Sequence, residues 1–452
     1  MLDINTYSEN IGLTKFTLEL RRMNTQIKDF LAFLDGSNSR FHASMQIQSR
    51  LLAAGFIALP ENKAFELKKG GKYYICRKDT AVLAFVMGSE PLAKSGIKMA
   101  ASHIDYPSLK LKMDSVRNDK GTIRCGVEVY SGVDINGGGI MHTWTDRELS
   151  VAGKVLIKTA TGVQTEVIDI KNPIAIIPNI AIHLNREVNK GFQYNRQSHL
   201  QAILSVSSGS GNPLYELVAK KLKVKAEQIV DSELYLYDPR PATLTGTEGD
   251  MISSQGLDNL AMTHAILRGL LSSQKPKQTA MGVFFDHEEI GSQTPQGAMS
   301  SLLSEVLERL CLSQSSSRED YYLALRHSFM ISADMAHAYH PSYAEKYDPD
   351  YSPYMNKGIV IKLNANHRYA STIDSTARFI ALCDAAKVPY QKFLIRSDMP
   401  CGSTVGPIVA AQLGLDTVDI GNPIWAMHSI RETGGTLDHL YLIKVMEKYF
   451  SK

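Results

Sequence analysis

Short apolar runs alternate with longer segments of helical periodicity from about residue 245 to the end of this 452-residue chain. The apolar runs predict strands at residues 279–285, 329–333, 358–364, 390–396 and 417–420. Between them, apolar residues that recur every three to four positions predict helices at residues 257–272, 295–310, 372–386, 403–413 and 434–450. Strands that alternate with helices in this way indicate an α/β domain with a largely parallel sheet flanked by helices.

The N-terminal third continues this pattern, whereas the middle of the chain does not. Residues 24–58 predict two helices, and apolar runs predict strands at 73–77, 81–88 and 97–102. From about residue 110 to 240, short alternating segments separated by glycine turns predict a mostly β region with one helix at 213–222. We therefore expect a β domain of residues 111–244, inserted between two parts of one α/β domain, residues 1–110 and 245–452.

Composition and charge argue against several classes of protein. Hydrophobic residues make up 44% of the chain and charged residues 21%, as in ordinary globular proteins, and the formal net charge is +3. So small a charge, without any basic run, argues against nucleic acid as a partner, and no apolar stretch approaches the ~20 residues of a membrane span. Five dispersed cysteines without a C-x-x-C pair, and an N-terminus without a signal-peptide pattern, predict a reducing compartment, the cytoplasm.

The strand expected at residues 279–285 ends in four consecutive ionisable residues, Asp286, His287, Glu288 and Glu289. Two adjacent carboxylates at the end of a buried strand are costly unless a cation neutralises them. For this segment on its own, a solvated turn after an edge strand is the alternative. Other segments of the chain end in the same way, however, and together they favour a metal site.

Histidine and aspartate side chains follow other expected strands or open the next element. They are His103 and Asp105 after residues 97–102, Asp258 at the start of the 257–272 helix, Asp334 after 329–333, and His428 after the 419–425 region. In open α/β sheets, ligands bind beyond the carboxyl ends of the strands. Two histidines, two aspartates and one glutamate form a ligand set for two divalent cations, with zinc, manganese or cobalt as the candidates.

Individual roles within such a site follow from position. Asp258 is the candidate bridge between the two metals, and Asp105, two residues after His103, is placed to orient its imidazole. One of Glu288 and Glu289 would bind metal, and the other would act as general base toward water. The residues alone do not say which glutamate has which role.

Other interpretations of single residues remain open. Any one of the 13 histidines could be structural, and Asp258 could simply cap a helix. The pair His287–Glu288 is not part of a zincin motif, because position 291 is Gly291 rather than histidine. No G-x-S-x-G motif occurs, and a thiol nucleophile, Cys401 beside His428, is the remaining catalytic alternative.

These motifs, in this order along nearly the whole chain, resemble those of the aspartyl aminopeptidase family of co-catalytic zinc metallopeptidases. The segments that carry the resemblance are residues 29–34, 41–43, 70–74, 102–107, 257–260, 285–292, 332–338 and 426–432. The resemblance implies a zinc-exopeptidase fold in which His103 and Asp334 bind one metal. Glu289 and His428 would bind the other metal, and Asp258 would bridge both.

The resemblance also has implications for catalysis, substrate and partners. It implies that Glu288 is the catalytic base, and that His183 of an inserted dimerisation domain reaches a neighbouring subunit's active site to stabilise the tetrahedral intermediate. Proteins of this family assemble as tetrahedral dodecamers, so we expect a large homo-oligomer with a peptide substrate. Lys362, Tyr369 and His337 match positions that line a pocket for an acidic side chain. A structural role at the protein surface is the alternative for Lys362.

Two departures from the family pattern leave the preferred N-terminal residue open. His287 stands where the family usually has asparagine, and Ile359 stands where it usually has proline. We expect a metal-dependent aminopeptidase that removes acidic residues, Asp or Glu, from peptide N-termini, with a preference for neutral residues such as leucine as the alternative. A carboxypeptidase or deacylase of the same fold class, and a shell protein without catalysis, are the two rival functions.

Overall fold

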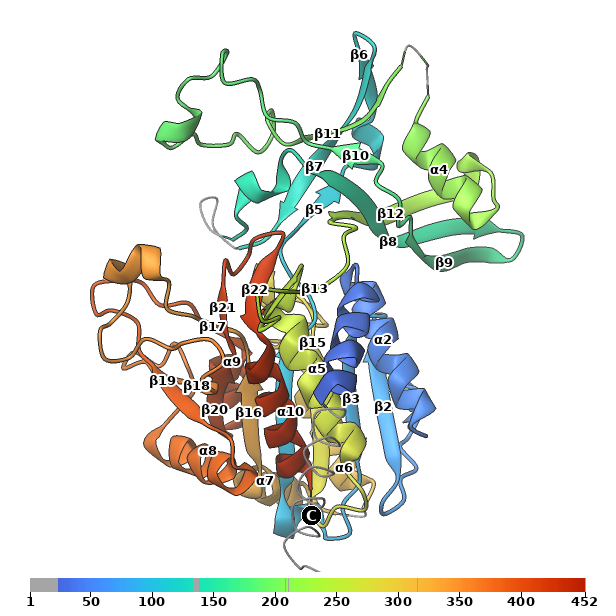
Figure 1. The fold of residues 1–452 in the computed structure, drawn as a ribbon. Helices are drawn as coiled ribbons and strands as arrows, with labels where there is room; N and C mark the ends of the chain where they lie inside the picture. Colours follow the sequence, from blue (N-terminus) through green and yellow to red (C-terminus); the bar gives the residue numbers. More distant parts are fainter. Residues whose placement is uncertain (1–22, 133–137, 208, 210, 315, 452) are drawn as a thin grey trace, which may run out of the picture.

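The structure, a computed structural model, describes residues 23–132, 138–207, 209, 211–314 and 316–451. Figure 1 shows two stacked parts: a lower part in which helices flank a long central sheet, and an upper part made mostly of strands. The upper part is built from the middle of the chain, whereas the lower part combines its N-terminal and C-terminal segments.

In the described part of the chain, the central sheet of the lower part has nine strands, and its middle is parallel. Four neighbouring parallel strands form this middle: β15 (Thr279–Phe285), β4 (Ile97–His103), β16 (Phe329–Ala333) and β20 (Asp416–Gly421). Antiparallel pairs join it to the outer strands, with β3 (Ala81–Val86) beside β15 and β18 (Ile359–Lys362) beside β20. The edges are completed by β2 (Lys72–Arg77) and β1 (Ile57–Ala58) on one side and β19 (Tyr390–Phe393) on the other. The sheet is therefore mixed, and the expectation of a largely parallel sheet holds for its centre only.

Helices cover both faces of this sheet, because successive residues of a strand point to opposite sides. Along β3, Val82 and Ala84 face the side covered by α2 (Arg40–Ala53), α5 (Leu257–Ser272), α8 (Ile373–Ala386) and α10 (Thr436–Phe450). Leu83 and Phe85 face the opposite side, which is covered by α6 (Leu302–Leu312), α7 (Arg318–His327) and α9 (Val405–Leu413). Burial on both faces explains why these strands are continuous apolar runs in the sequence.

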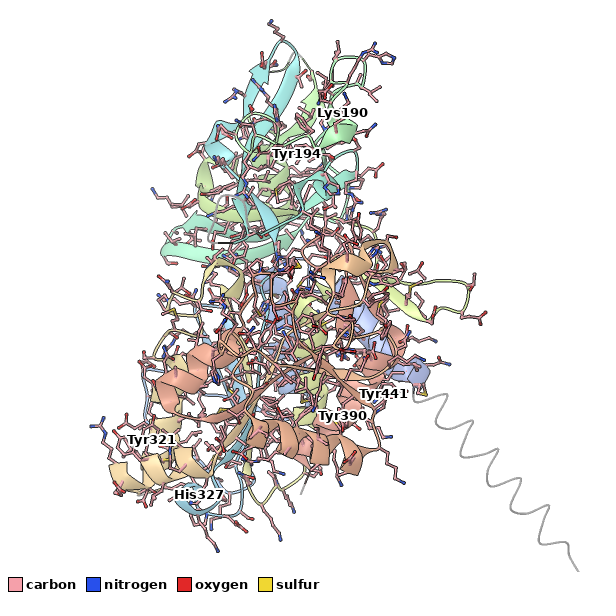
Figure 2. The ribbon with its side chains drawn as sticks, turned by 90° about the vertical axis from the view of Figure 1, so that its left-hand side faces the viewer. Lys190, Tyr194, Tyr321, His327, Tyr390 and Tyr441 are labelled. Carbon is pink, nitrogen blue, oxygen red and sulfur yellow. The ribbon has the colours of Figure 1, made fainter. Side chains whose placement is uncertain are left out.

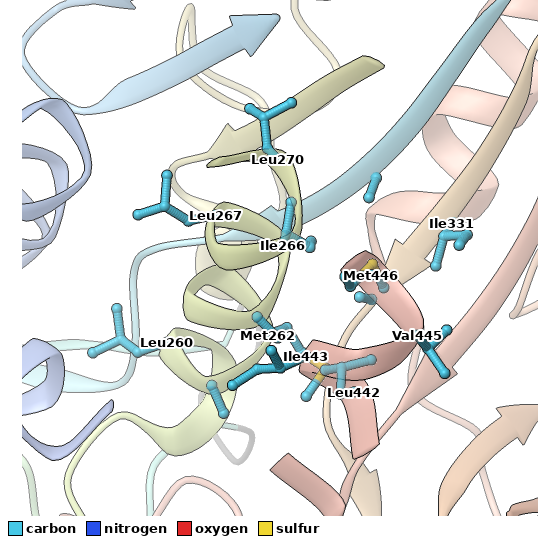
Figure 3. Close-up of a cluster of buried hydrophobic side chains, with 14 of the residues drawn as sticks. Leu260, Met262, Ile266, Leu267, Leu270, Ile331, Leu442, Ile443, Val445 and Met446 are labelled. Atoms are coloured by element: carbon cyan, nitrogen blue, oxygen red, sulfur yellow. The ribbon is translucent and has the colours of Figure 1, made fainter. Parts of the chain in front are cut away.

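Helices α5 and α10 pack closely on the first of these faces. Met262 and Ile266 of α5 belong to the same buried cluster as Ile443 and Met446 of α10 (Figure 3). A Cβ atom at Gly269 would lie 2.5 Å from the Cβ of Met446, so glycine is required where the two helices meet. This contact anchors the helix whose first turn carries Asp258.

The segment after β15 differs from the expectation. The helix expected at residues 295–310 begins only at Leu302, and α7 follows it as a helix that the pattern did not predict. Before Leu302 the backbone folds over the loop after β15: the Asp286 N–H donates to Gln296 O, and the Met299 N–H donates to Ser292 O, both at 3.2 Å. These tertiary hydrogen bonds override the local helical pattern.

Strands β5 (Ser108–Leu111) to β12 (Ile229–Tyr237) form the upper part. The strands between them are β6 (Arg117–Asp119), β7 (Thr122–Tyr130), β8 (Glu148–Thr159), β9 (Gly162–Asp169), β10 (Ala175–Ile176) and β11 (Gln201–Val206). Antiparallel pairing runs in the order β10–β11–β7–β5–β12–β8–β9, and an additional pairing of β10 with β8 closes the sheet on itself. The helix predicted here is confirmed as α4 (Pro213–Leu222).

A smaller sheet lies between the two parts (Figure 1). Its strands are β13 (Thr243–Thr245), β14 (Met251–Ser254), β22 (Glu432–Gly435), β21 (Pro423–Trp425) and β17 (Ala336–His337), in that order. The loop that joins β21 to β22 carries His428, so this sheet supports one side of the candidate site. Among the helices that the structure describes, none is long and apolar enough to cross a membrane.

Candidate metal centre and active site

The carboxyl ends of three neighbouring parallel strands bring most of the candidate residues together. β4 ends at His103, which is in register with Phe285 at the end of β15. The next turn, η5 (Glu288–Ile290), carries both glutamates. Asp334 directly follows β16, where its N–H donates to Ile420 O at 2.9 Å. Three segments that are far apart in the sequence therefore meet at one edge of the sheet.

Asp258 lies between the two candidate histidines. Its Oδ1 atom is 3.7 Å from His103 Nε2, and its Oδ2 atom is 3.3 Å from His428 Nε2. His103 Nε2 also lies 3.7 Å from an oxygen of Asp334, and His428 Nε2 lies 3.4 Å from an oxygen of Glu289. Two ligand groups result, and Asp258 belongs to both: His103, Asp258 and Asp334 in one, and Asp258, Glu289 and His428 in the other.

The residues of these groups fit divalent cations. Asp258 and Glu289 are only 3% and 6% exposed, and Asp258 Oδ1 and Glu289 Oε1 are buried without a hydrogen-bond donor in the described part of the chain. Buried carboxylate oxygens without partners are costly, and a cation would remove that cost. Imidazole nitrogens combined with carboxylate oxygens are donors that suit zinc, manganese and cobalt.

The site holds more negative than positive charge. Burial, together with the nearby carboxylates of Asp334, Asp105 and Asp258, raises the pKa of Glu288 to about 8, although His103 opposes this. Burial also raises the pKa of Glu289 well above its usual range, with the carboxylates of Asp258 and Glu288 adding to the effect. The ionised forms of these glutamates need additional positive charge, which divalent cations would supply.

Glu288 differs from Glu289 in its surroundings. Its Oε2 atom is 4.0 Å from His103 Nε2, and its side chain is 20% exposed, whereas that of Glu289 is 4% exposed. A third group of potential ligands, His103 with both glutamates, overlaps the first two. Glu288 is thus next to the candidate metal ligands and also the more accessible of the two glutamates.

Asp105 holds the peptide segment that carries these glutamates. Its Oδ1 accepts the N–H of Glu288 and its Oδ2 accepts the N–H of Glu289, each at 3.1 Å. The hydroxyl of Tyr130, from β7 of the upper part, donates to Oδ2 at 2.8 Å. Asp105 Oδ1 also lies 3.4 Å from His103 Nδ1, and the backbone oxygen of Asp105 lies 2.9 Å from the same nitrogen. Asp105 therefore lies on the Nδ1 side of the His103 ring.

Glu432 is a buried carboxylate of the site to which the sequence analysis gave no role. It is 1% exposed and opens β22. Its oxygens accept the backbone N–H groups of Asp258, at 2.9 Å, and His428, at 2.8 Å. Glu432 lies within the motif segment 426–432, but its spacing from His428 is not that of a known metal-binding motif.

The three residues expected at the substrate pocket lie close together beside Asp334. Lys362 is 3% exposed, which contradicts the surface alternative; its Nζ donates to Met335 O at 2.8 Å and lies 5.2 Å from the ring centre of Tyr369. Although burial opposes it, the Lys362 charge lowers the pKa of Asp334. Burial, followed by the charges of Lys362 and His428, lowers the pKa of His337 to about 4. His337 also lines a neighbouring pocket of about 290 Å³, together with Tyr347, Phe393, Ile395 and Arg396.

His183 lies apart from this centre within the single chain. It is exposed, in the upper part, between Ile182 and Leu184, which are 50% and 76% exposed. The same segment continues to η3 (Val188–Lys190) and projects from the upper part at the upper left of Figure 1. Figure 2 shows Lys190 in the upper part, far from Tyr390 in the lower part.

Cys401 has surroundings that differ from those of a nucleophile next to His428. It packs against the apolar cluster that contains Tyr369 and Phe393. His428 Nε2 faces the carboxylates of Asp258 and Glu289 instead. A carboxylate-based metal centre therefore accounts for His428 better than a thiol–imidazole pair.

Comparisons with known proteins point to one family. The model of a family described as aminopeptidase I zinc metalloprotease (M18) matches residues 33–450. A probable M18 family aminopeptidase 2 from Clostridium acetobutylicum is 42% identical over 430 residues, which cover 94% of this chain and 98% of that protein.

Solved structures are similar to this chain in both fold and sequence. A chain in the cryo-EM structure of the Ape4 and Nbr1 complex has a TM-score of 0.91 and 34% identity, covering 95% of this chain and 86% of that chain. The structure of the S. cerevisiae mApe1 dodecamer gives a TM-score of 0.82 at 25% identity, covering 95% of this chain and 97% of that chain. The match of a family model over nearly the whole length, the sequence identity and the shared α/β fold show that this chain belongs to the M18 family of zinc aminopeptidases, metal-dependent hydrolases of peptide bonds.

Proposed function

We propose that this M18 aminopeptidase uses two divalent cations in each subunit. The observation that carries the proposal is the position of Asp258, whose two carboxylate oxygens lie 3.7 and 3.3 Å from different histidines. His103 and Asp334 complete one ligand group, and Glu289 and His428 complete the other. A carboxylate shared between two such groups is what a two-metal site requires.

Zinc is the proposed metal at both positions, with manganese or cobalt as the alternatives. Two cations bound there would polarise the scissile carbonyl and lower the pKa of water toward ~7. Glu288 would take a proton from that water and pass it to the leaving amine. Its place suits this role, because Glu288 Oε2 lies 4.0 Å from His103 Nε2 and its side chain is the more exposed of the two glutamates.

Asp105 supports this role of Glu288. Because its carboxylate accepts the backbone N–H groups of Glu288 and Glu289, it fixes the turn that carries the base and one ligand. Its position beside His103 Nδ1 would keep Nε2 directed toward Asp258 and Asp334, the residues that would hold the same cation.

Acidic N-terminal residues are the proposed substrates. Lys362 brings a buried positive charge to the side of the centre near Asp334, and Tyr369 and His337 flank it. A substrate carboxylate would gain a charge-assisted interaction there. A preference for neutral residues such as leucine is the alternative, and it would leave the metal chemistry unchanged.

A homo-oligomer, a tetrahedral dodecamer, is the proposed assembly. The similar S. cerevisiae mApe1 is described as a dodecamer, and the segment around His183 exposes Ile180, Ile182 and Leu184. Burial of these apolar side chains against a second copy would bring His183 to another subunit's centre. Residues 111–244 would form the dimerisation domain. The five free cysteines agree with a cytoplasmic setting.

The experiment that tests the proposed function is cleavage of chromogenic Asp-, Glu- and Leu-aminoacyl substrates before chelation, after chelation and after return of zinc. We expect metal-dependent cleavage with Asp and Glu preferred. A preference for Leu would overturn the pocket assignment alone. Cleavage of substrates with a blocked N-terminus would overturn the aminopeptidase mechanism.

A further inference from the structure

Two of the candidate ligands lie in irregular backbone. Asp258 has φ −83° and ψ 104°, which is not helical although it lies in the first turn of α5. His428 has a positive φ of 67° in the loop before β22. Neither residue is held by the regular hydrogen bonds of a helix or strand, so each backbone N–H needs another acceptor if its side chain is to keep one position.

One carboxylate accepts both of these N–H groups. Glu432 Oε2 accepts from Asp258 at 2.9 Å, and Glu432 Oε1 accepts from His428 at 2.8 Å. The backbone of Glu432 is itself fixed, because it pairs with Ser254 of β14 at the start of β22. The side chain is 1% exposed, so water does not compete for these hydrogen bonds.

We infer that Glu432 is a positioning residue that sets the spacing between Asp258 and His428, and so determines the affinity of the metal position formed by Asp258, Glu289 and His428. This inference rests on the proposed two-metal function. A carboxylate suits the role because it presents two acceptor oxygens and no donor. A glutamine has one acceptor oxygen, and its amino group would face one of the two N–H groups.

The variant Glu432→Gln tests the inference directly. We expect its metal affinity at the Asp258–Glu289–His428 position to fall by about 10- to 100-fold, as is typical for residues that support metal ligands. After dialysis at low free zinc, the variant should keep about one metal per subunit where the wild type keeps two. Excess zinc should restore most of kcat with little change in KM, because the substrate pocket is untouched.

Asp438 offers a matched control. It is 0% exposed, and its carboxylate also accepts two backbone N–H groups, those of Asn356 at 2.5 Å and Gly358 at 2.9 Å. These bonds join the start of α10 to the segment before β18, and neither N–H belongs to a candidate ligand. Asp438→Asn should therefore lower the thermal unfolding temperature without changing metal content.

The measurements are metal content by mass spectrometry, zinc affinity by competition with a chromophoric chelator, and circular dichroism of the metal-free protein. If Glu432→Gln does not fold, Glu432→Asp replaces it, because the shorter side chain draws the carboxylate away from the N–H groups of Asp258 and His428. Two metals bound with wild-type affinity in the folded Glu432 variant would overturn the inference, as would equal metal loss in Asp438→Asn. A wild-type protein that binds only one metal would instead overturn the two-metal proposal, and this inference with it.

Discussion

The N–H of Glu288 donates to the carboxylate of Asp105 at 3.1 Å, so the candidate base is held by a residue from another strand end. The same carboxylate accepts the N–H of Glu289 and the hydroxyl of Tyr130, and it lies 3.4 Å from His103 Nδ1. One buried side chain thus fixes a candidate ligand and the turn that carries both glutamates. Because Tyr130 belongs to β7, the upper part of the molecule also contributes to the site.

Replacement of Asp105 by asparagine should weaken both metal binding and catalysis. The amide keeps one acceptor oxygen for three donors, so we expect metal affinity and kcat to fall by about 10- to 100-fold. Tyr130→Phe is the matched control: it removes one donor and should cost about fivefold, roughly the 1 kcal/mol of one hydrogen bond. Steady-state kinetics measure kcat, and zinc titration measures metal affinity, for both variants. Equal effects of the two substitutions would contradict the role given to Asp105.

Glu288→Gln should separate catalysis from metal binding. Because Glu288 is proposed to move a proton rather than to bind metal, we expect normal metal content and a fall in kcat of about 10²- to 10⁴-fold. In Glu289→Gln a ligand is lost, so metal content itself should fall. Metal analysis and kinetics on the same samples distinguish the two glutamates. Substantial turnover in Glu288→Gln would exclude Glu288 as the base.

Lys362→Met should change substrate preference, since methionine keeps much of the apolar stem but removes the charge. We expect kcat/KM for Asp and Glu substrates to fall by about 10- to 100-fold, the range of a hydrogen bond to a charged group, with a smaller change for Leu. Lys357→Met, at an exposed lysine near the start of β18, is the control. Equal losses for all substrates would show that Lys362 acts through Asp334, whose pKa it lowers, rather than through the substrate.

Substitutions at His183 and Leu184 test whether the segment that projects from the upper part contacts a second subunit. Leu184 is 76% exposed, and Leu184→Arg should dissociate the oligomer because it would bury a charge against a second copy. His183→Ala should keep the oligomer and lower kcat. Light scattering combined with activity measurements checks both. An active monomer in the Leu184 variant would show that His183 has no role in another subunit.

A buried histidine pair should make stability depend on pH. His264 Nδ1 lies 3.0 Å from His439 Nε2, and its Nε2 lies 3.1 Å from Asp29. Burial lowers the pKa of His264 from 6.5 to about 4 and lowers that of His439 well below its usual range; the charges of Asp29, Arg50 and Arg268 surround His264. His264 is thus less protonated in the folded protein than in the unfolded chain between pH 6.5 and 4.

The contribution of His264 to the free energy of unfolding should therefore be fully present above pH 6.5 and fall by about 3 kcal/mol as the pH drops toward 4. Denaturant unfolding between pH 7.5 and 5 measures this dependence. His439→Gln removes one titrating ring but keeps a hydrogen-bonding group, so its stability should depend less steeply on pH. The same substitution at the exposed His327 should leave the dependence unchanged, and an unchanged slope in His439→Gln would contradict the prediction.

Local sequence patterns determined most of the regular elements and the positions from which the site is built. Residues 257–272, 279–285 and 329–333 form the predicted helix and strands with the same bounds. Apolar periodicity indicated the helix, and continuous apolar runs indicated strands that are buried on both faces. The residues that follow these strands come together because the carboxyl ends of parallel strands meet at one edge of a sheet.

Only the tertiary structure decided the mixed pairing of the sheet, the late start of α6 at Leu302, the burial of Lys362 and the contacts of Glu432. Each of these depends on contacts between distant segments. Glu432, for example, accepts the N–H of a residue that precedes it by 174 positions. A local pattern indicates which apolar side chains will be buried, but not which distant group a polar side chain will meet. Which distant groups meet depends on how the whole chain packs, so these hydrogen bonds cannot be inferred from a local pattern.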